Sequence, residues 1–216
     1  MNKADAGRVW AAVTALVVAV GIVVQLFVTA GNSDGYFPDN PDRVFNVFAY
    51  FTIQSNLLLG GTCLLLALDP ERWQTMLFRV LRLNGVVCIA VTGIVYHLVL
   101  AGTDHLTKAG AFANLLIHTA TPLLGVLGWL IFGPRGQTGY RVAGWSIVYP
   151  LLWLAFTLIR GEGTGFYPYP FVDVSEHGYG QVLLNCLFVA LLFLALAFGA
   201  VLLDRRIGSS KTTADR

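Results

Sequence analysis

Residues 181–203 read QVLLNCLFVALLFLALAFGAVLL, a stretch without a single charged side chain. A helix needs about 20 predominantly apolar residues to cross the roughly 30 Å hydrocarbon core of a bilayer. Five further stretches of this kind precede it, which gives six apolar stretches in all, at residues 9–30, 44–68, 77–100, 112–132, 142–159 and 181–203. This pattern predicts a polytopic membrane protein.

The composition favours helices that fill a single domain. Hydrophobic residues make up 56% of the chain and charged residues only 12%, against about 25% charged residues in soluble domains. Uninterrupted apolar runs are typical of membrane helices, whereas barrel strands alternate between apolar and polar residues. We therefore predict an all-α fold, a six-helix transmembrane bundle over residues 1–207 with a disordered cytoplasmic tail at 208–216. The first span exceeds the apolar core of a signal peptide, so we expect an uncleaved helix.

The basic residues predict the orientation of the bundle. If the spans alternate in direction, eleven of the fourteen Lys and Arg residues lie on one side: Lys3, Arg8, Arg72, Arg79, Arg82, Arg135, Arg141, Arg205, Arg206, Lys211 and Arg216. Only Arg43, Lys108 and Arg160 lie on the other. The positive-inside rule then places both termini in the cytoplasm of a multi-pass cell-membrane protein, which we expect in a bacterial plasma membrane. The net charge of +2 reflects this topology, and we predict no nucleic-acid partner.

Polar residues inside the spans indicate where function lies, because lipid penalises them. Near its start the second span carries Thr52, Ser55 and Asn56, which share one helix face. The fourth span carries Asn114 and His118 on one stripe, followed by a proline that frees a backbone carbonyl. Hydroxyls and amides in spans often bond a neighbouring turn or helix, and that structural interpretation stays open for each of them.

The depths of Thr52 and His118 allow the two side chains to meet. At 1.5 Å per residue, Thr52 lies about 12 Å inside the span 44–68 and His118 about 9 Å inside the span 112–132. Neutral imidazole can accept a proton from a hydroxyl. A hydroxyl beside an imidazole is the minimal pair of nucleophile and base for acyl transfer.

Two further clusters lie toward the outer side. The loop 160–180 combines glycines with Tyr167, Tyr169 and two prolines, followed by His177. Aromatic residues usually anchor a protein at the membrane interface, but this density predicts a rigid cap over the mouth of the bundle. The other cluster is His97, which follows a tyrosine near the outer end of the third span.

These residues resemble those of the androgen-induced and androgen-dependent TFPI-regulating proteins and their bacterial relatives. That family consists of multipass threonine hydrolases that cleave fatty acid esters of hydroxy fatty acids. The resemblance rests on Phe51-Thr52-Ile53, on Asn114 and His118 followed by Thr119 and Pro122, and on Gly165 to Phe171 with the acidic and His residues after it. It extends loosely over most of the chain, through the shared spans.

The resemblance implies an intramembrane lipid-ester hydrolase that acts on a fatty-acyl ester, with Thr52 as the nucleophile and His118 as its general base. Ser55 is a rival hydroxyl in the more polar Thr-Ile-Gln-Ser-Asn run of this chain. Asn56 or Asn114 is expected to orient His118 or to stabilise the oxyanion. We expect His97, Tyr167, Tyr169 and His177 to support the site or bind substrate. No cofactor or metal is expected, and the cysteines match no metal or redox motif.

Two other classes of function stay open at this point. His97 and His118 on adjacent spans are also a possible pair of axial ligands for haem in an electron-transfer protein. A small transporter is the other alternative, although the sequence has no internal repeat and few intramembrane charges.

Overall fold

The computed structural model describes residues 2–33, 35–69, 74–102 and 106–214. Local sequence marks the ends of some of its helices. Arg72 and Arg216, two of the basic residues used to predict the orientation, lie outside these residues. Asn2 begins α1 (Lys3–Ala30) by accepting the Asp5 N–H at 2.8 Å. Helix α8 (Val148–Thr164) is capped by Gly165, whose φ of 71° is the left-handed conformation that glycine adopts readily.

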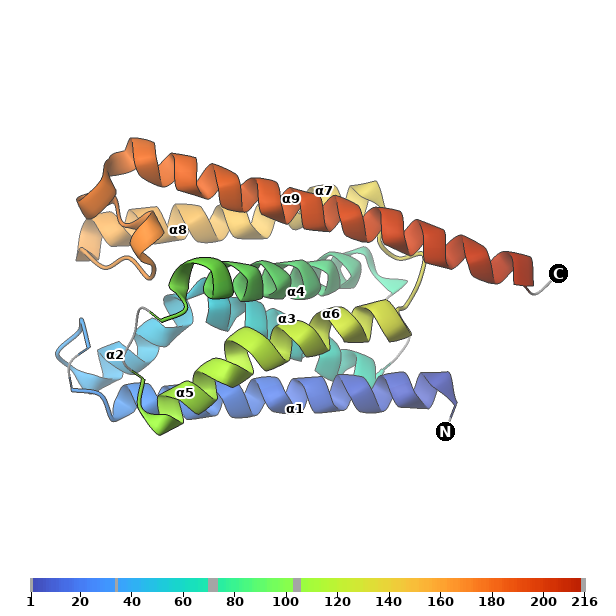
Figure 1. Ribbon diagram of the computed structural model, residues 1–216, viewed down its shortest axis with the longest axis horizontal. Coiled ribbons are helices and arrows are strands. Elements are labelled where there is room, and N and C mark those ends of the chain that lie inside the picture. The colour runs from blue at the N-terminus through green and yellow to red at the C-terminus, as the bar shows by residue number, and fades with distance from the viewer. Residues whose placement is uncertain (1, 34, 70–73, 103–105, 215–216) are drawn as a thin grey trace.

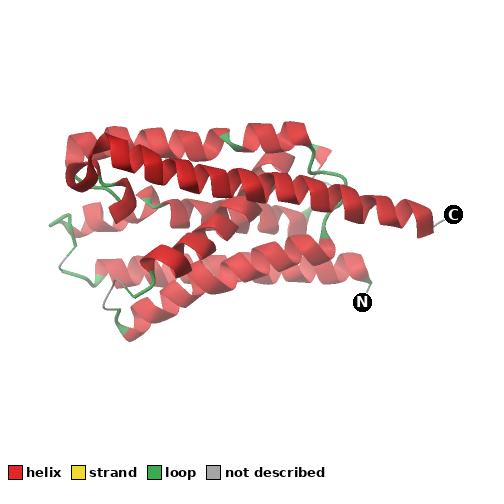
Figure 2. Cartoon of the chain, turned by 45° about the horizontal axis from the view of Figure 1, so that its top comes forward, coloured by secondary structure: helices red, strands yellow, loops and turns green. Residues whose placement is uncertain are grey.

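The other helices follow in the order expected from the sequence. They are α2 (Asn40–Asn46), α3 (Phe51–Leu68), α4 (Met76–Val95), α5 (Lys108–Leu115), α6 (Thr121–Phe132), α7 (Tyr140–Ser146), α8 (Val148–Thr164) and α9 (Val174–Ala214). Short 3₁₀ turns lie at Val47–Ala49 and Pro170–Val172, and π-helical turns at Tyr96–Leu100 and Leu116–Ala120. No strand occurs among the described residues (Figure 2).

Six helical segments are long and apolar enough to cross a membrane, which confirms the all-α six-helix prediction. They are Lys3–Ala30, Phe51–Leu68, Met76–Leu100, Lys108–Phe132, Tyr140–Thr164 and Val174–Ile207. Figure 1 shows α8 and α9 on one side of the bundle, α1 on the opposite side and α4 between them. Both termini lie at the same end, as six spans require. The protein is therefore a multi-pass membrane protein.

The boundaries of the second span differ from the prediction. Instead of one helix over 44–68, the chain forms α2 and a 3₁₀ turn, and then extends at Tyr50 (ψ 132°) before α3 begins at Phe51. The expectation that Thr52 lies two turns inside its helix is therefore wrong, because Thr52 is the second residue of α3. The break leaves the first N–H groups of α3 without helical acceptors.

Smaller differences affect the last two spans. The fifth is interrupted at Ile147, between α7 and α8. The sixth begins earlier than predicted, and Gly178 (φ 70°, ψ 160°) interrupts its first turns. Helix α9 also includes residues 208–214, which the sequence analysis assigns to a disordered tail. This stretch contains no proline that would end the helix.

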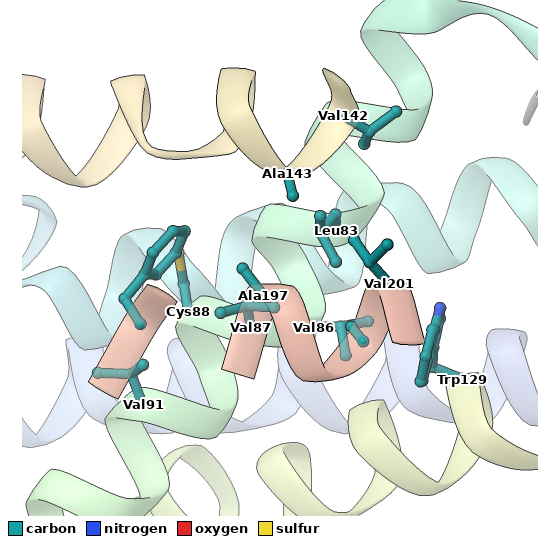
Figure 3. Packing of buried hydrophobic residues seen from close by; sticks show 12 residues of the cluster. Leu83, Val86, Val87, Cys88, Val91, Trp129, Val142, Ala143, Ala197 and Val201 are labelled. Carbon is teal, nitrogen blue, oxygen red and sulfur yellow. The ribbon is translucent and has the colours of Figure 1, made fainter. Parts of the chain in front are cut away.

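The core of the bundle is built around α4. Leu83, Val87 and Cys88 of α4 pack against Ala197 and Val201 of α9, as Figure 3 shows. The cysteines are free thiols, fully buried at positions 63 and 88 and half-buried at 186. Large apolar side chains on the outside of the spans, such as Leu16 and Leu152, are exposed. That pattern suits a surface that lipid covers.

We predict that a membrane-impermeant maleimide will distinguish the two ends of the bundle. In a background in which Cys63, Cys88 and Cys186 are replaced by alanine, Ser175→Cys and Ala4→Cys place single thiols at exposed positions near opposite ends. Intact cells should label Ser175→Cys at once, and Ala4→Cys only after the membrane is permeabilised. The reverse pattern would place the termini outside the cell.

Candidate active site

An apolar pocket lies between α4, α8 and α9 beneath the loop 165–173, with about 830 Å³ of empty space when the open solvent at its mouth is included. None of the described residues that line it is charged, and its hydroxyl groups belong to Thr52, Thr92, Tyr96 and Tyr169. Leu151 of α8 lines the pocket while 53% of its surface is exposed, so the pocket borders the lipid-facing surface there. A largely apolar pocket with a few convergent polar groups is the usual form of a ligand site.

Thr52 lies on the wall of this pocket and is only 5% exposed. Its backbone N–H has no acceptor within α3 and donates to Oη of Tyr169 at 3.0 Å. Its Oγ1 lies 3.1 Å from the same Oη. The hydroxyl of Tyr169 therefore contacts Thr52 through both the backbone and the side chain.

Tyr169 is held by an aromatic cage. Its ring stacks on Phe171 at 5.4 Å between centroids and meets Tyr50 edge-on at 5.7 Å. Trp153 lies against the ring at 6.0 Å, and its indole N–H donates to the Ala49 carbonyl at 2.9 Å. Burial raises the pKa of Tyr169 to about 12, so the phenol stays protonated at physiological pH. The predicted cap thus inserts a neutral hydroxyl into the site.

Asn56 links the turn that carries Thr52 to the turn that carries His118. Its fully buried amide nitrogen donates to the Thr52 carbonyl at 2.9 Å and to the Ile117 carbonyl at 3.1 Å. Its oxygen accepts from the Thr121 hydroxyl at 2.7 Å. Asn56 therefore holds the two segments together, and in the part of the chain that the structure describes no hydrogen bond joins its amide to the imidazole of His118.

His118 lies in the π-helical turn Leu116–Ala120, a kind of irregularity frequent at functional sites. Its ring stacks on Tyr96 at 4.2 Å between centroids, and the Asn114 amide donates to the Tyr96 hydroxyl. Nδ1 of His118 is buried and makes no hydrogen bond of ordinary geometry to a described residue. The structure therefore places Tyr96 against His118 and in the pocket wall, but no hydrogen bond joins His118 to Thr52 among the described residues.

The hydroxyl of Ser55, the rival to Thr52, does not reach the pocket. It is completely buried, does not line the cavity and makes no hydrogen bond to a described residue. Tyr167 packs on the backbone of α8, where a Cβ on Gly161 would lie 2.1 Å from its ring. His177 is exposed in the first turns of α9 and does not line the pocket.

His97 lies outside the pocket and adds no support to the haem alternative. Its Nε2 lies 3.1 Å from Oγ1 of Thr119, and its ring meets Tyr96 edge-on at 5.1 Å. Tyr96 thus contacts both imidazoles and covers a face of the His118 ring. Among the described residues no group of three or more His, Cys, Asp or Glu side chains is arranged to hold a metal ion.

Comparisons of the chain with family models, with curated proteins and with solved structures find no match. What the site can do follows from its own residues. Three of these were missed as site residues at the sequence level: Tyr96, Thr92 and Trp153. For Tyr96, the one sequence signal of a role in the site was its position next to His97, an intramembrane histidine. Thr92 and Trp153 belong to no recognisable motif in the sequence. Only the packing of α4 and α8 places both in the pocket wall.

We predict that Asn56→Ala lowers the stability of the folded protein. The change removes two hydrogen bonds between segments far apart in sequence, at about 0.5–1.5 kcal/mol each. Thr62→Val on the same helix is the matched control, because the buried Thr62 hydroxyl bonds only carbonyls of its own helix. Thermal unfolding of the purified protein in detergent should show a clearly larger loss for Asn56→Ala. Equal losses would mean that Asn56 is not the link between the two segments.

Proposed function

We propose that this protein is an intramembrane lipid-ester hydrolase with Thr52 as its nucleophile and His118 as its general base. The observation that carries the proposal is the position of the Thr52 hydroxyl, buried in the wall of an uncharged pocket within the membrane-spanning bundle. Such a pocket suits an acyl chain, and a hydroxyl in its wall suits an ester carbonyl. The resemblance to the threonine hydrolases of fatty acid esters of hydroxy fatty acids points to the same chemistry.

The reaction begins with attack of Thr52 Oγ1 on the ester carbonyl carbon. A new C–O bond forms, the carbonyl π electrons move to oxygen, and His118 takes the hydroxyl proton. Collapse of the tetrahedral intermediate breaks the bond to the alcohol, which leaves with the proton from His118. A water molecule then attacks the acyl-threonine, again with His118 as base, and releases the fatty acid and the free Thr52 hydroxyl.

The His118 imidazole needs an approach to Thr52 that the resting geometry does not provide. Catalytic hydrogen bonds are often long or absent without substrate and form in the substrate complex. One contact favours that approach, because Asn56 ties the backbone of the Thr52 turn to the residue before His118. His118 itself does not line the pocket, whereas Tyr96, whose ring is stacked on the imidazole, does. The proposal therefore requires a movement of His118 or a bridging water to complete the transfer path.

We expect the substrate to be a fatty-acyl ester that enters from the bilayer. The proposal therefore assigns the protein to lipid metabolism in the plasma membrane. No metal or organic cofactor enters the proposed steps, since proton transfer and nucleophilic attack require only the two side chains.

We predict that a fluorophosphonate probe will label the purified protein in detergent at Thr52. Thr52→Val, which keeps the shape but lacks the hydroxyl, should abolish labelling and ester turnover, and His118→Ala should reduce both by about 10²–10⁴-fold. Thr52→Ser should retain labelling because it restores a hydroxyl at the same place.

Ser55→Ala is the matched control for that experiment. It removes a buried hydroxyl three residues from Thr52 that does not line the pocket, so labelling should persist. Labelling that survives Thr52→Val but disappears with Ser55→Ala would assign the nucleophile to Ser55. A wild-type protein that neither reacts with the probe nor cleaves esters would refute the hydrolase proposal.

A further inference from the structure

The hydroxyl of Tyr169 contacts both the backbone and the side chain of Thr52. Its oxygen accepts the Thr52 N–H at 3.0 Å and lies 3.1 Å from Thr52 Oγ1, at the edge of the pocket. We infer that Tyr169 is the oxyanion donor of the site, the residue whose O–H stabilises the negative charge that forms on the substrate carbonyl oxygen. This inference rests on the proposed function, because it assigns a role within the same reaction.

The direction of the hydrogen bonds supports a donor role. A backbone N–H can only donate, so Tyr169 Oη is the acceptor from Thr52 N–H. The proton of the phenol can then point at Thr52 Oγ1, which lies 3.1 Å away, and in that contact either oxygen is able to donate. Burial raises the pKa of Tyr169, which keeps this proton on the phenol and disfavours a role as a base.

The position also fits the movement of charge in the reaction. When Oγ1 bonds to the carbonyl carbon, the electron pair of the C=O bond moves to the carbonyl oxygen. The substrate carbonyl oxygen can then take the place of Tyr169 Oη as the acceptor of the Thr52 N–H. It can also accept a hydrogen bond from the Tyr169 hydroxyl. The nucleophile's own N–H is an established type of oxyanion donor, and the start of α3 adds the positive end of a helix dipole.

Preorganisation is what makes such a donor effective, and the cage around Tyr169 provides it. Phe171, Tyr50 and Trp153 contact the ring from three directions, and the residue is only 8% exposed. A donor held in place before the reaction needs no reorganisation as the charge develops. Removal of one oxyanion donor typically lowers kcat by about 10²–10³-fold.

Thr92 is the competing candidate for this role. Its Oγ1 is buried, has no hydrogen-bond partner among the described residues, and belongs to a residue that lines the same pocket. It does not share the double contact with Thr52. Thr92→Val therefore separates a general need for pocket hydroxyls from a specific need for Tyr169.

The test compares Tyr169→Phe with Tyr167→Phe and Thr92→Val in the full-length protein in detergent. Tyr169→Phe removes only the hydroxyl and keeps the ring in its cage. With the p-nitrophenyl ester of a medium-chain fatty acid as substrate, it should lower kcat by about 10²-fold or more while KM changes little. Tyr167→Phe removes a hydroxyl from the same loop outside the pocket and should match the wild type. Thr92→Val removes a hydroxyl of the pocket wall and should lower kcat much less than Tyr169→Phe does.

A second measurement excludes a merely structural effect. An alkyl trifluoromethyl ketone adds to a nucleophilic hydroxyl and forms a tetrahedral oxyanion, whereas the methyl ketone of the same chain binds without reacting. Tyr169→Phe should weaken the trifluoromethyl ketone by about 10²-fold and leave the affinity of the methyl ketone nearly unchanged. A loss that is equal for both ketones would reflect a damaged pocket and overturn the inference.

The outcomes separate this inference from the proposed function. If the wild type cleaves esters through Thr52 but Tyr169→Phe keeps its kcat, the hydrolase proposal stands and the oxyanion role is refuted. If Thr92→Val alone loses kcat, the donor is Thr92 and the inference also fails. If Thr52→Val cleaves esters as well as the wild type, the proposed function fails first, and the role of Tyr169 falls with it.

Discussion

A helix that begins inside a membrane protein exposes N–H groups that need acceptors, and this requirement organises the site. Helix α3 begins at Phe51 after an extended residue, and Tyr50 provides no side-chain cap. Without water in the hydrocarbon region, another part of the chain must satisfy the free donors. The loop between α8 and α9 does so with the hydroxyl of Tyr169, 117 residues away in sequence. Through this contact the loop supplies the acceptor that the start of α3 lacks and places a hydroxyl beside Thr52 Oγ1.

The second constraint is the link from α3 to the fourth span. Asn56 uses its whole amide on Thr52, Ile117 and Thr121, and the carbonyl of Ile117 is an acceptor where a π-helical turn disturbs the regular hydrogen bonding. Pro122 adds to the disturbance, because it lacks the N–H that would bond the His118 carbonyl. The three residues of this polar face, Thr52, Ser55 and Asn56, therefore have different roles. Asn56 joins helices, Thr52 faces the pocket, and Ser55 is buried away from it.

The sequence predicted the spans well because hydropathy reports directly on helices in lipid, and it singled out Thr52, Asn56, Asn114 and His118 because polar side chains stand out there. It could not predict the break at Tyr50, where Trp153, 104 residues away in sequence, donates to the Ala49 carbonyl. Nor could it show that the hydroxyl beside Thr52 belongs to Tyr169 and that Tyr96 covers His118. Polarity marks a residue as unusual for the membrane, but only tertiary packing decides its partner.

Leu151 lines the pocket, and 53% of its surface is exposed. At this residue the pocket therefore lies next to the acyl chains of the surrounding leaflet. A ligand that reaches the pocket past Leu151 never has to dissolve in water, so its supply is set by its mole fraction in that leaflet and by lateral diffusion. Occupancy of the site would then follow the lipid composition of the cell and respond little to aqueous metabolite levels.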